Sequence, residues 1–331
     1  MLERASALTK AENRLSVAKL ECYAQDWLLD CQLRQHSAQT VYCRKDYLSK
    51  LFWFLKKEGI EAVGTTELKQ FMLYLSKGHE EPGGRWGNPR MTEPMRPVSI
   101  HAYHRVLRAM FNWLENDEAI DFNPMKRVKP PVYRSEAKQP LSPERVTALL
   151  QAAKRSQHGK RDQAIVMALL DSGIRASELC RLKIADLDLA GQSFKVYGKG
   201  NKRRSCYLGR ATTKAISAYL RTSAREPDEP VFVGGRDTRA KTALTPSGLF
   251  QLLDRLAKNA GIPHGICSPH ALRRTFAVSL LRNGASVFAT QNLLGHTDLQ
   301  QTRLYCAVAQ ADVENQHRQF SPVDALAKKR G

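Results

Sequence analysis

A basic, proline-rich stretch near the middle of the chain constrains the fold more than any other sequence feature. Residues 123–139 contain three prolines and five Lys or Arg residues against one Glu. Proline stops regular helices and strands, and an extended basic segment suits a linker that lies along a polyanion. Because 331 residues exceed the usual size of a single domain, we predict two domains joined by a linker at 123–140.

Hydrophobic periodicity predicts what lies on each side of this linker. Residues 1–20 are polar and predict a tail, whereas residues 21–122 carry apolar stripes of helical period and predict a compact helical domain. Residues 141–320 add a stretch of alternating apolar and polar residues, which predicts short antiparallel strands with a turn at 198–201. Residues 321–331 are predicted to form a basic tail. The predicted fold class is mainly α with a small antiparallel β-sheet, a helical domain preceding an α+β domain.

Several helix ends carry specific capping residues. The predicted N-caps, each followed by proline, are Ser142, Thr245 and Ser268. The glycines predicted to end helices are Gly173, Gly284 and Gly295. By contrast, the Gly- and Pro-rich segment at 77–99 is too long for a tight connection and is predicted to be an exposed loop.

The charge balance indicates the kind of partner. The chain has 52 Lys and Arg residues against 32 Asp and Glu, a net charge of +20. An excess of this size is most often found in proteins that bind nucleic acid, with an anionic membrane surface as the weaker alternative. Basic residues, and histidines such as His104, flank the apolar stripes of residues 21–122, and we predict that these faces follow a phosphate backbone.

Neither a membrane segment nor a secretory signal is visible. The longest apolar run, Ala164–Leu170, is far shorter than the roughly 20 residues of a spanning helix. The N-terminal residues lack the apolar region of a signal peptide. We therefore predict a cytoplasmic protein that does not enter the membrane.

The cysteines and histidines do not form a convincing metal motif. Seven Cys residues are scattered without a CxxC pair, as in a reduced cytosolic protein. His264, Cys267 and His270 are spaced like ligands, but Pro263 and Gly265 interrupt the segment and no second ligand pair lies nearby. We predict no metal ion and no other cofactor.

Candidate catalytic residues occur in two groups. On the helix predicted after Ser268, His270 and Arg273 are three residues apart and share a face near its positive end. His296 follows in a loop, and Tyr305 lies on a further predicted helix. About a hundred residues upstream, Arg175 stands at the start of a predicted helix and Lys199 lies on the predicted turn between strands.

These residue types fit the attack of a tyrosine on a phosphodiester. A phenol has a pKa of about 10, so it needs a proton acceptor such as imidazole. The planar fork of arginine can hold two phosphate oxygens, and a lysine on a mobile turn can protonate the leaving 5′-oxygen. The six candidates cover these needs without a metal: Arg175, Lys199, His270, Arg273, His296 and Tyr305.

The same residues resemble the motifs of the tyrosine recombinase (phage integrase) family. In family order, the motifs are SGIRASELCRL with Arg175 and Glu178, VYGKGNKRR with Lys199, HALRR with His270 and Arg273, LGH ending at His296, and Tyr305 nine residues later. The resemblance covers residues 141–320, and residues 21–122 resemble the core-binding module of the family less specifically.

The resemblance implies a site-specific DNA recombinase that closes around duplex DNA as a C-shaped clamp. Tyr305 would form a 3′-phosphotyrosine, and four protomers would exchange strands through a Holliday junction during integration, excision, transposition or resolution. Because the phosphotyrosine link keeps the bond energy, neither ATP nor a metal would be required. The segment after Tyr305 would pack on a neighbouring protomer.

The residues also leave alternatives open. Lys202 shares the turn with Lys199 and competes with it as the proton donor, and Glu178 either orients neighbouring groups or lies on a helix surface. Arg274 stands where many relatives have histidine and is assigned no chemistry. The rival functions are a type IB topoisomerase, which shares the phosphotyrosine chemistry, and a non-catalytic DNA-binding relative.

Overall fold

This computed structural model of the protein describes residues 14–79, 83–132, 139–197, 203–235, 242–295 and 321. The chain divides into two compact units, Met1–Ser135 and Glu136–Gly331, here called unit 1 and unit 2. Among the described residues, no helix is both long enough and apolar enough to cross a membrane.

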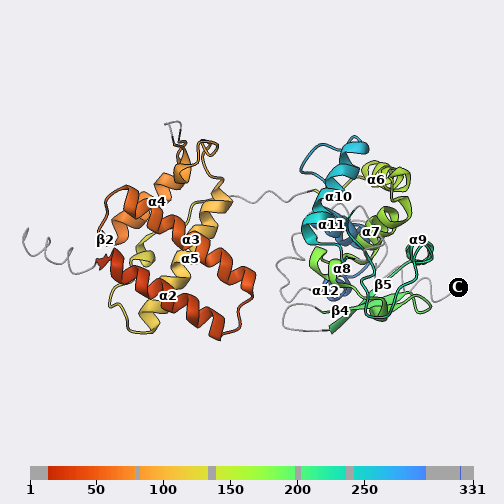
Figure 1. Ribbon diagram of the computed structural model, residues 1–331, viewed down its shortest axis with the longest axis horizontal. Helices are drawn as coiled ribbons and strands as arrows, with labels where there is room; N and C mark the ends of the chain where they lie inside the picture. The colour runs from red at the N-terminus through yellow and green to blue at the C-terminus, as the bar shows by residue number, and fades with distance from the viewer. Residues whose placement is uncertain are drawn as a thin grey trace, which may run out of the picture. The chain divides into compact units, whose positions relative to one another are not determined.

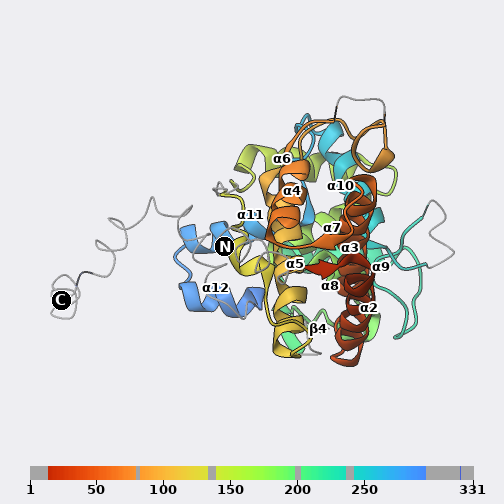
Figure 2. The same cartoon turned by 90° about the vertical axis from the view of Figure 1, so that its left-hand side faces the viewer.

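Unit 1 is built from helices around a dense aromatic and aliphatic core. Its described elements are β1 (Leu15–Ser16), α2 (Val17–Leu33), α3 (Ala38–Lys57), β2 (Ala62–Val63), α4 (Thr65–Ser76), the 3₁₀ turn η1 (Arg85–Gly87), α5 (Pro97–Asn116) and the 3₁₀ turn η2 (Pro124–Arg127). Helix α5 packs against α2, α3 and α4 (Figures 1 and 2). Its residues Leu107, Met110 and Phe111 are fully buried, which explains the long apolar stripe in its sequence.

The first helix of unit 1 begins earlier than the predicted start near residue 21. Ser16 accepts a hydrogen bond from the backbone N of Lys19 at 3.4 Å and caps α2 at Val17. Leu20 is fully buried, so the first turn is already part of the core. The two-residue strand β1 pairs antiparallel with β2 and fixes the chain before the helix.

The segment at 77–99 was predicted to be exposed, and in part this prediction is wrong. The ring of Trp86 packs 5.5 Å from Trp53 and 5.4 Å from Tyr74, measured between ring centroids. Arg85 is only 7% exposed and donates a hydrogen bond to the backbone oxygen of Glu93. Aromatic burial against α3 and α4 therefore holds the middle of this segment onto the unit.

The start of the predicted linker also belongs to the core of unit 1. Met125 and Val128 are buried, and His104 donates a hydrogen bond from Nε2 to the backbone oxygen of Val128 at 2.8 Å. His104 is itself buried, so its predicted place on a basic face is wrong. The apolar residues between the prolines explain the difference, because Met125 and Val128 gain more from burial than from an extended, solvated path.

Unit 2 combines helices with a small sheet, and the predicted fold class is confirmed. Its described elements are α6 (Pro143–Arg155), α7 (Gly159–Ser172), α8 (Ala176–Arg181), η3 (Ile184–Asp186), β3 (Leu187–Asp188), β4 (Ser193–Tyr197), β5 (Arg203–Tyr207), α9 (Arg210–Leu220), α10 (Pro246–Asn259), α11 (Pro269–Arg282) and α12 (Val287–Leu294). The strands form an antiparallel sheet in the order β3-β4-β5. In Figures 1 and 2, β4 and α12 lie towards one end of unit 2, and α6 and α10 lie towards the other.

The predicted helix ends of unit 2 are confirmed. Thr245 Oγ1 accepts from the backbone N of Gly248 at 3.0 Å, and Ser268 Oγ accepts from the backbone N of Ala271 at 3.2 Å. The predicted N-cap Ser142 accepts from the backbone N of Arg145 at 3.4 Å. The glycines that follow the helices have positive φ, namely +59° at Gly173, +89° at Gly284 and +62° at Gly295. The turn predicted at 198–201 lies outside the described residues.

Candidate active site

Three of the six predicted catalytic residues lie in the described part of the chain. Arg273 is buried on α11, Arg175 is half-buried at the start of α8, and His270 is exposed in the first turn of α11. The other candidates lie outside the described residues, and so does the competing proton donor; these residues are Lys199, Lys202, His296 and Tyr305.

Arg273 connects three segments of unit 2. Helix α11 packs against α7 and α12. The Arg273 guanidinium donates one hydrogen bond to the backbone oxygen of Gly173, just after α7, and another to the backbone oxygen of Leu294 at 2.5 Å, the last residue of α12. Because the side chain is only 4% exposed, these contacts fix the guanidinium in one place.

Arg175 contacts the same end of α12 as Arg273. Its Nη2 donates to the backbone oxygen of Gly295 at 3.1 Å. The two arginines therefore bind consecutive carbonyl groups, those of Leu294 and Gly295. The next residue in the chain is His296. Two of the predicted catalytic residues thus hold the backbone that leads directly into a third.

Gly173 allows these parts to come together. Its φ is +59°, and a Cβ at this position would lie 2.3 Å from Cδ1 of Phe276 and 3.1 Å from Cδ2 of Leu294. Phe276 lies on α11 and Leu294 ends α12, so any side chain at 173 would push both helices away from the turn that carries Arg175. Only glycine meets both the backbone and the packing requirement.

We predict that Gly173→Ala destabilises unit 2 and lowers DNA cleavage. Gly261→Ala is the matched control, because Gly261 has a φ of +68° but nothing within 4 Å of its Cβ position. Each substitution incurs the backbone strain of about 1–2 kcal/mol, and Gly173→Ala adds about 1–3 kcal/mol from overpacking. Hydrogen exchange of the α7 and α11 amides measures the difference, and equal stability of the two variants would contradict this account.

Glu178 joins Arg175 to a second arginine, Arg204, to which the sequence motifs assigned no role. Oε1 of Glu178 accepts from Nη1 of Arg175 at 2.9 Å and from Nη1 of Arg204 at 2.7 Å. Oε2 accepts from the backbone N of Arg175 at 2.9 Å and from Nη2 of Arg204 at 2.8 Å. The side chain of Glu178 is 3% exposed, so the helix-surface alternative for this residue is wrong.

The protonation state of Glu178 follows from these contacts. Burial alone raises the pKa of this carboxyl, but hydrogen bonds and charge from Arg204, with the backbone and side chain of Arg175, outweigh burial and lower the pKa to about 2. Glu178 is therefore ionised at neutral pH. Of the four charged groups considered so far, three guanidiniums stand against one carboxylate, which leaves this cluster with an excess of positive charge suited to a phosphate.

We predict that Glu178→Gln destabilises unit 2 at neutral pH by about 3 kcal/mol, because two partly buried guanidiniums lose their counter-charge at a site that is itself buried. The folded pKa of about 2 lies below the ordinary value of 4.5, so the carboxylate contributes stability that is complete above about pH 4.5 and is lost as the pH falls towards 2. The wild type and the variant should therefore converge in stability across that window.

Hydrogen exchange of the α8 and β5 amides reports this loss in unit 2. The four tryptophans all lie in unit 1, so tryptophan fluorescence serves as an internal reference; they are Trp27, Trp53, Trp86 and Trp113. Glu226→Gln, at an exposed carboxylate, is the matched control and should leave exchange unchanged. Unchanged protection in Glu178→Gln at pH 7 would contradict the assignment.

Arg204 is the last residue of the VYGKGNKRR motif, in which only Lys199 was given a role, but its place on the strand is a sequence signal of its own. In the β4–β5 ladder, Arg204 pairs with Val196 and Cys206 pairs with Phe194. Val196, Phe194 and Cys206 are all buried, so Arg204 lies on the inward face of β5. An arginine is unusual at such a position unless it is paired with a carboxylate. A charged residue at an inward-facing strand position was therefore the indication of a buried partner.

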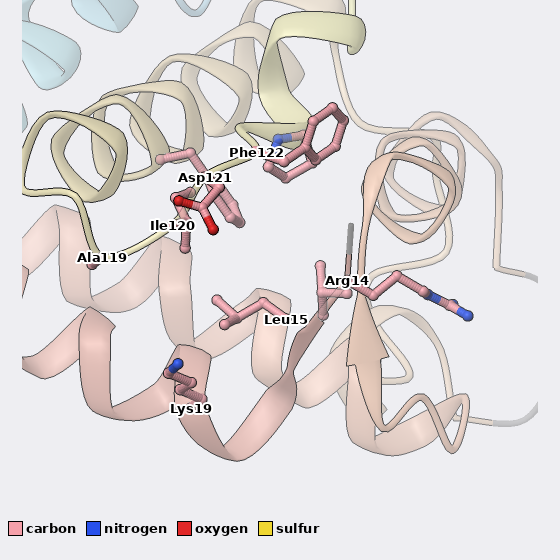
Figure 3. A pocket seen from close by; sticks show the side chains of 10 residues that line it. Arg14, Leu15, Lys19, Ala119, Ile120, Asp121 and Phe122 are labelled. Atoms are coloured by element: carbon pink, nitrogen blue, oxygen red, sulfur yellow. The ribbon is translucent and has the colours of Figure 1, made fainter. Parts of the chain in front are cut away.

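A cavity of about 180 Å³ in unit 1 does not share this chemistry. Leu15, Ile120 and Phe122 supply apolar side chains to it, and Lys19 and Asp121 supply one charge of each sign (Figure 3). The guanidinium of Arg14 points away from the cavity in Figure 3 and pairs with Glu67. This cavity has no excess of positive charge and is not a phosphate site.

The fold and the arginine cluster define a class of enzyme that the family comparison names. The model of the phage integrase family matches residues 139–312, more than half of the chain. The chain belongs to this family, whose members are tyrosine recombinases, the class of enzymes that carries out site-specific DNA recombination.

Individual relatives agree with this assignment. The tyrosine recombinase XerD of Listeria innocua is 33% identical over 237 residues, which cover 70% of this chain and 78% of the relative. The tyrosine recombinase XerC of Bacillus subtilis is 28% identical over 297 residues, which cover 87% of this chain and 92% of the relative. The solved structure of the Tn1549 transposon integrase, in complex with transposon right end DNA, is similar to this chain with a TM-score of 0.66 at 19% sequence identity. The alignment covers 89% of this chain and 99% of that chain, so the two share a fold.

Proposed function

We propose that this chain cleaves and rejoins duplex DNA at a specific site through a covalent link between Tyr305 and the 3′-phosphate. The observation that carries this proposal is the convergence of Arg175 and Arg273 on the consecutive carbonyls of Leu294 and Gly295. This convergence joins the two separate groups of family motifs into one cationic site.

In the proposed cleavage step, the phenol oxygen of Tyr305 attacks the phosphorus while an imidazole accepts its proton. His296 and His270 are the candidates for this acceptor. Arg175 and Arg273 stabilise the charge that builds on the non-bridging oxygens. The bond from phosphorus to the 5′-oxygen breaks, and Lys199 or Lys202 gives the leaving oxygen a proton. The phosphotyrosine keeps the bond energy, so rejoining by a 5′-hydroxyl needs no ATP.

The remaining parts of the proposal concern DNA binding and assembly. Exposed cationic side chains lie along helices of unit 1, including Lys45 and Lys56 on α3 and Arg105 and Arg108 on α5. We assign these helices, within residues 21–122, to DNA binding, because such side chains neutralise phosphates. The part of the predicted linker at 123–140 that follows Val128 would continue along the duplex, and four protomers would exchange strands through a Holliday junction in the cytoplasm.

Recombination between two copies of the chain's DNA site tests this proposal. A supercoiled plasmid with paired sites, recovered from the DNA that flanks the gene, should yield excised circles, and a plasmid without sites should remain supercoiled. Because the guanidiniums supply the positive charge, the product should form equally well in EDTA. Relaxation of any supercoiled plasmid without excised circles would instead identify a topoisomerase, and DNA binding without covalent product would identify a non-catalytic relative.

A further inference from the structure

We propose that Arg204 is a positioning residue for DNA cleavage, which binds both carboxylate oxygens of Glu178 and so leaves the charge of Arg175 available to the scissile phosphate. This inference rests on the proposed function. The roles that the family motifs supply do not include Arg204, which is identified by its contacts in unit 2.

The geometry of the pair is that of a fixed support. Arg204 donates from Nη1 and Nη2 to the two oxygens of Glu178 at 2.7 and 2.8 Å, the parallel two-bond arrangement that gives an arginine–carboxylate pair its directionality. Both side chains are largely shielded, with 14% of Arg204 and 3% of Glu178 exposed. Arg204 comes from β5 and Glu178 from α8, so the pair holds the sheet to the helix that begins at Arg175.

The electrostatic consequence concerns Arg175. Glu178 also accepts from the backbone and the side chain of Arg175, so without another partner its negative charge would cancel the positive charge of Arg175. Arg204 supplies that other partner. The three groups together keep a net charge of +1, and the side chain of Arg175 remains about one third exposed, at 35%.

Arg204 also borders the turn that leads to His296. A Cβ on Gly295 would lie 2.8 Å from Cδ and 3.1 Å from Nε of Arg204, so this side chain lies directly against the Gly295 backbone. The carbonyl of the same glycine accepts a hydrogen bond from Arg175. Loss of Arg204 would therefore disturb the backbone at Gly295 as well as the pairing of Glu178.

The test is single-turnover cleavage of a nicked duplex carrying the chain's own site, measured at saturating protein, beside the Kd for the same duplex. Arg204→Met is expected to lower the cleavage rate by about 10- to 100-fold, as displacement of a reacting group by about 1 Å does, and to change the Kd by less than about threefold. Arg203→Met is the matched control, because Arg203 is the exposed neighbour of Arg204 on the same strand and this substitution removes the same charge. It should leave the cleavage rate at saturation unchanged.

Two further variants separate positioning from folding. Arg204→Lys restores the charge without the two-bond arrangement and should recover part of the rate. Arg204→Met combined with Glu178→Gln removes the carboxylate that would neutralise Arg175, and it should cleave faster than Arg204→Met alone. Hydrogen exchange of the α8 amides shows whether each variant is folded.

The outcomes distinguish this inference from the proposed function. If the wild type forms no covalent product, the proposed function fails. If the wild type cleaves and folded Arg204→Met cleaves at the same rate, the inference about Arg204 is overturned and the proposed function stands. A loss of rate that Arg204→Lys and the double variant both leave unimproved would also overturn it, because neither the charge nor its effect on Arg175 would then matter.

Discussion

Replacing Arg273 with alanine is expected to lower the rate of DNA cleavage by about 100- to 1,000-fold, the usual cost of removing a preorganised charge-stabilising donor. The arginine is buried and binds the backbone oxygens of Gly173 and Leu294, so its loss removes one of the positive charges of the site and also the bridge between α7 and α12. Single-turnover cleavage of a nicked site at saturating protein measures the effect.

Two variants of the same helix serve as controls for this prediction. Arg273→Lys keeps the charge but lacks the planar fork, and it should fall between the wild type and Arg273→Ala. Arg282→Ala removes an arginine from the exposed last turn of α11 and should cleave at the wild-type rate. Cleavage by folded Arg273→Ala within about threefold of the wild type would show that Arg273 is not part of the catalytic charge, because loss of a functional donor costs far more.

The features that could be predicted from the sequence are those set by local interactions. Ser268 caps α11 through a hydrogen bond to a backbone N three residues away, and Gly295 ends α12 with its own positive φ. Such signals depend on residues within one helical turn, so the order and type of the residues are sufficient to predict them. The same holds for the alternation that predicts the antiparallel strands β4 and β5.

The features that could not be predicted depend on contacts between distant parts of the chain. Trp86 is partly buried because four other aromatic side chains contact it, and nothing in its own Gly-rich segment indicates those partners. Met125 and Val128 resemble linker residues until α5 supplies a surface for them. In both cases the neighbouring Gly and Pro residues predicted an irregular chain, and long-range burial decided where that chain lies.

The candidate site combines both situations. Family motifs marked Arg175 and Arg273, but the distance between them in sequence gave no reason to expect that they bind adjacent carbonyls. For Arg204 the sequence contained only a weak indication, an arginine at an inward-facing strand position. Its hydrogen bonds to both carboxylate oxygens of Glu178 explain why an arginine is found there. The predicted roles of Lys199, His296 and Tyr305 stay predictions that experiment must decide.

Tyr305→Phe is expected to abolish covalent attachment to DNA, because phenylalanine has no oxygen to attack the phosphorus. Loss of an essential nucleophile lowers a rate by about a million-fold in enzymes where this has been isolated, so no covalent product should be detectable. Tyr207→Phe is the matched control, since Tyr207 is an exposed tyrosine on β5 and its hydroxyl has no proposed role. It should form the product as the wild type does.

The central claim is tested most directly by identifying the residue that becomes linked to DNA. A nicked duplex carrying the recombination site is incubated with the wild-type chain, the protein–DNA product is isolated on a denaturing gel, and the digested peptide is sequenced by mass spectrometry. We predict a single nucleotide-bearing peptide modified at Tyr305. Attachment at any other residue, or a covalent product that persists in Tyr305→Phe, would contradict the account.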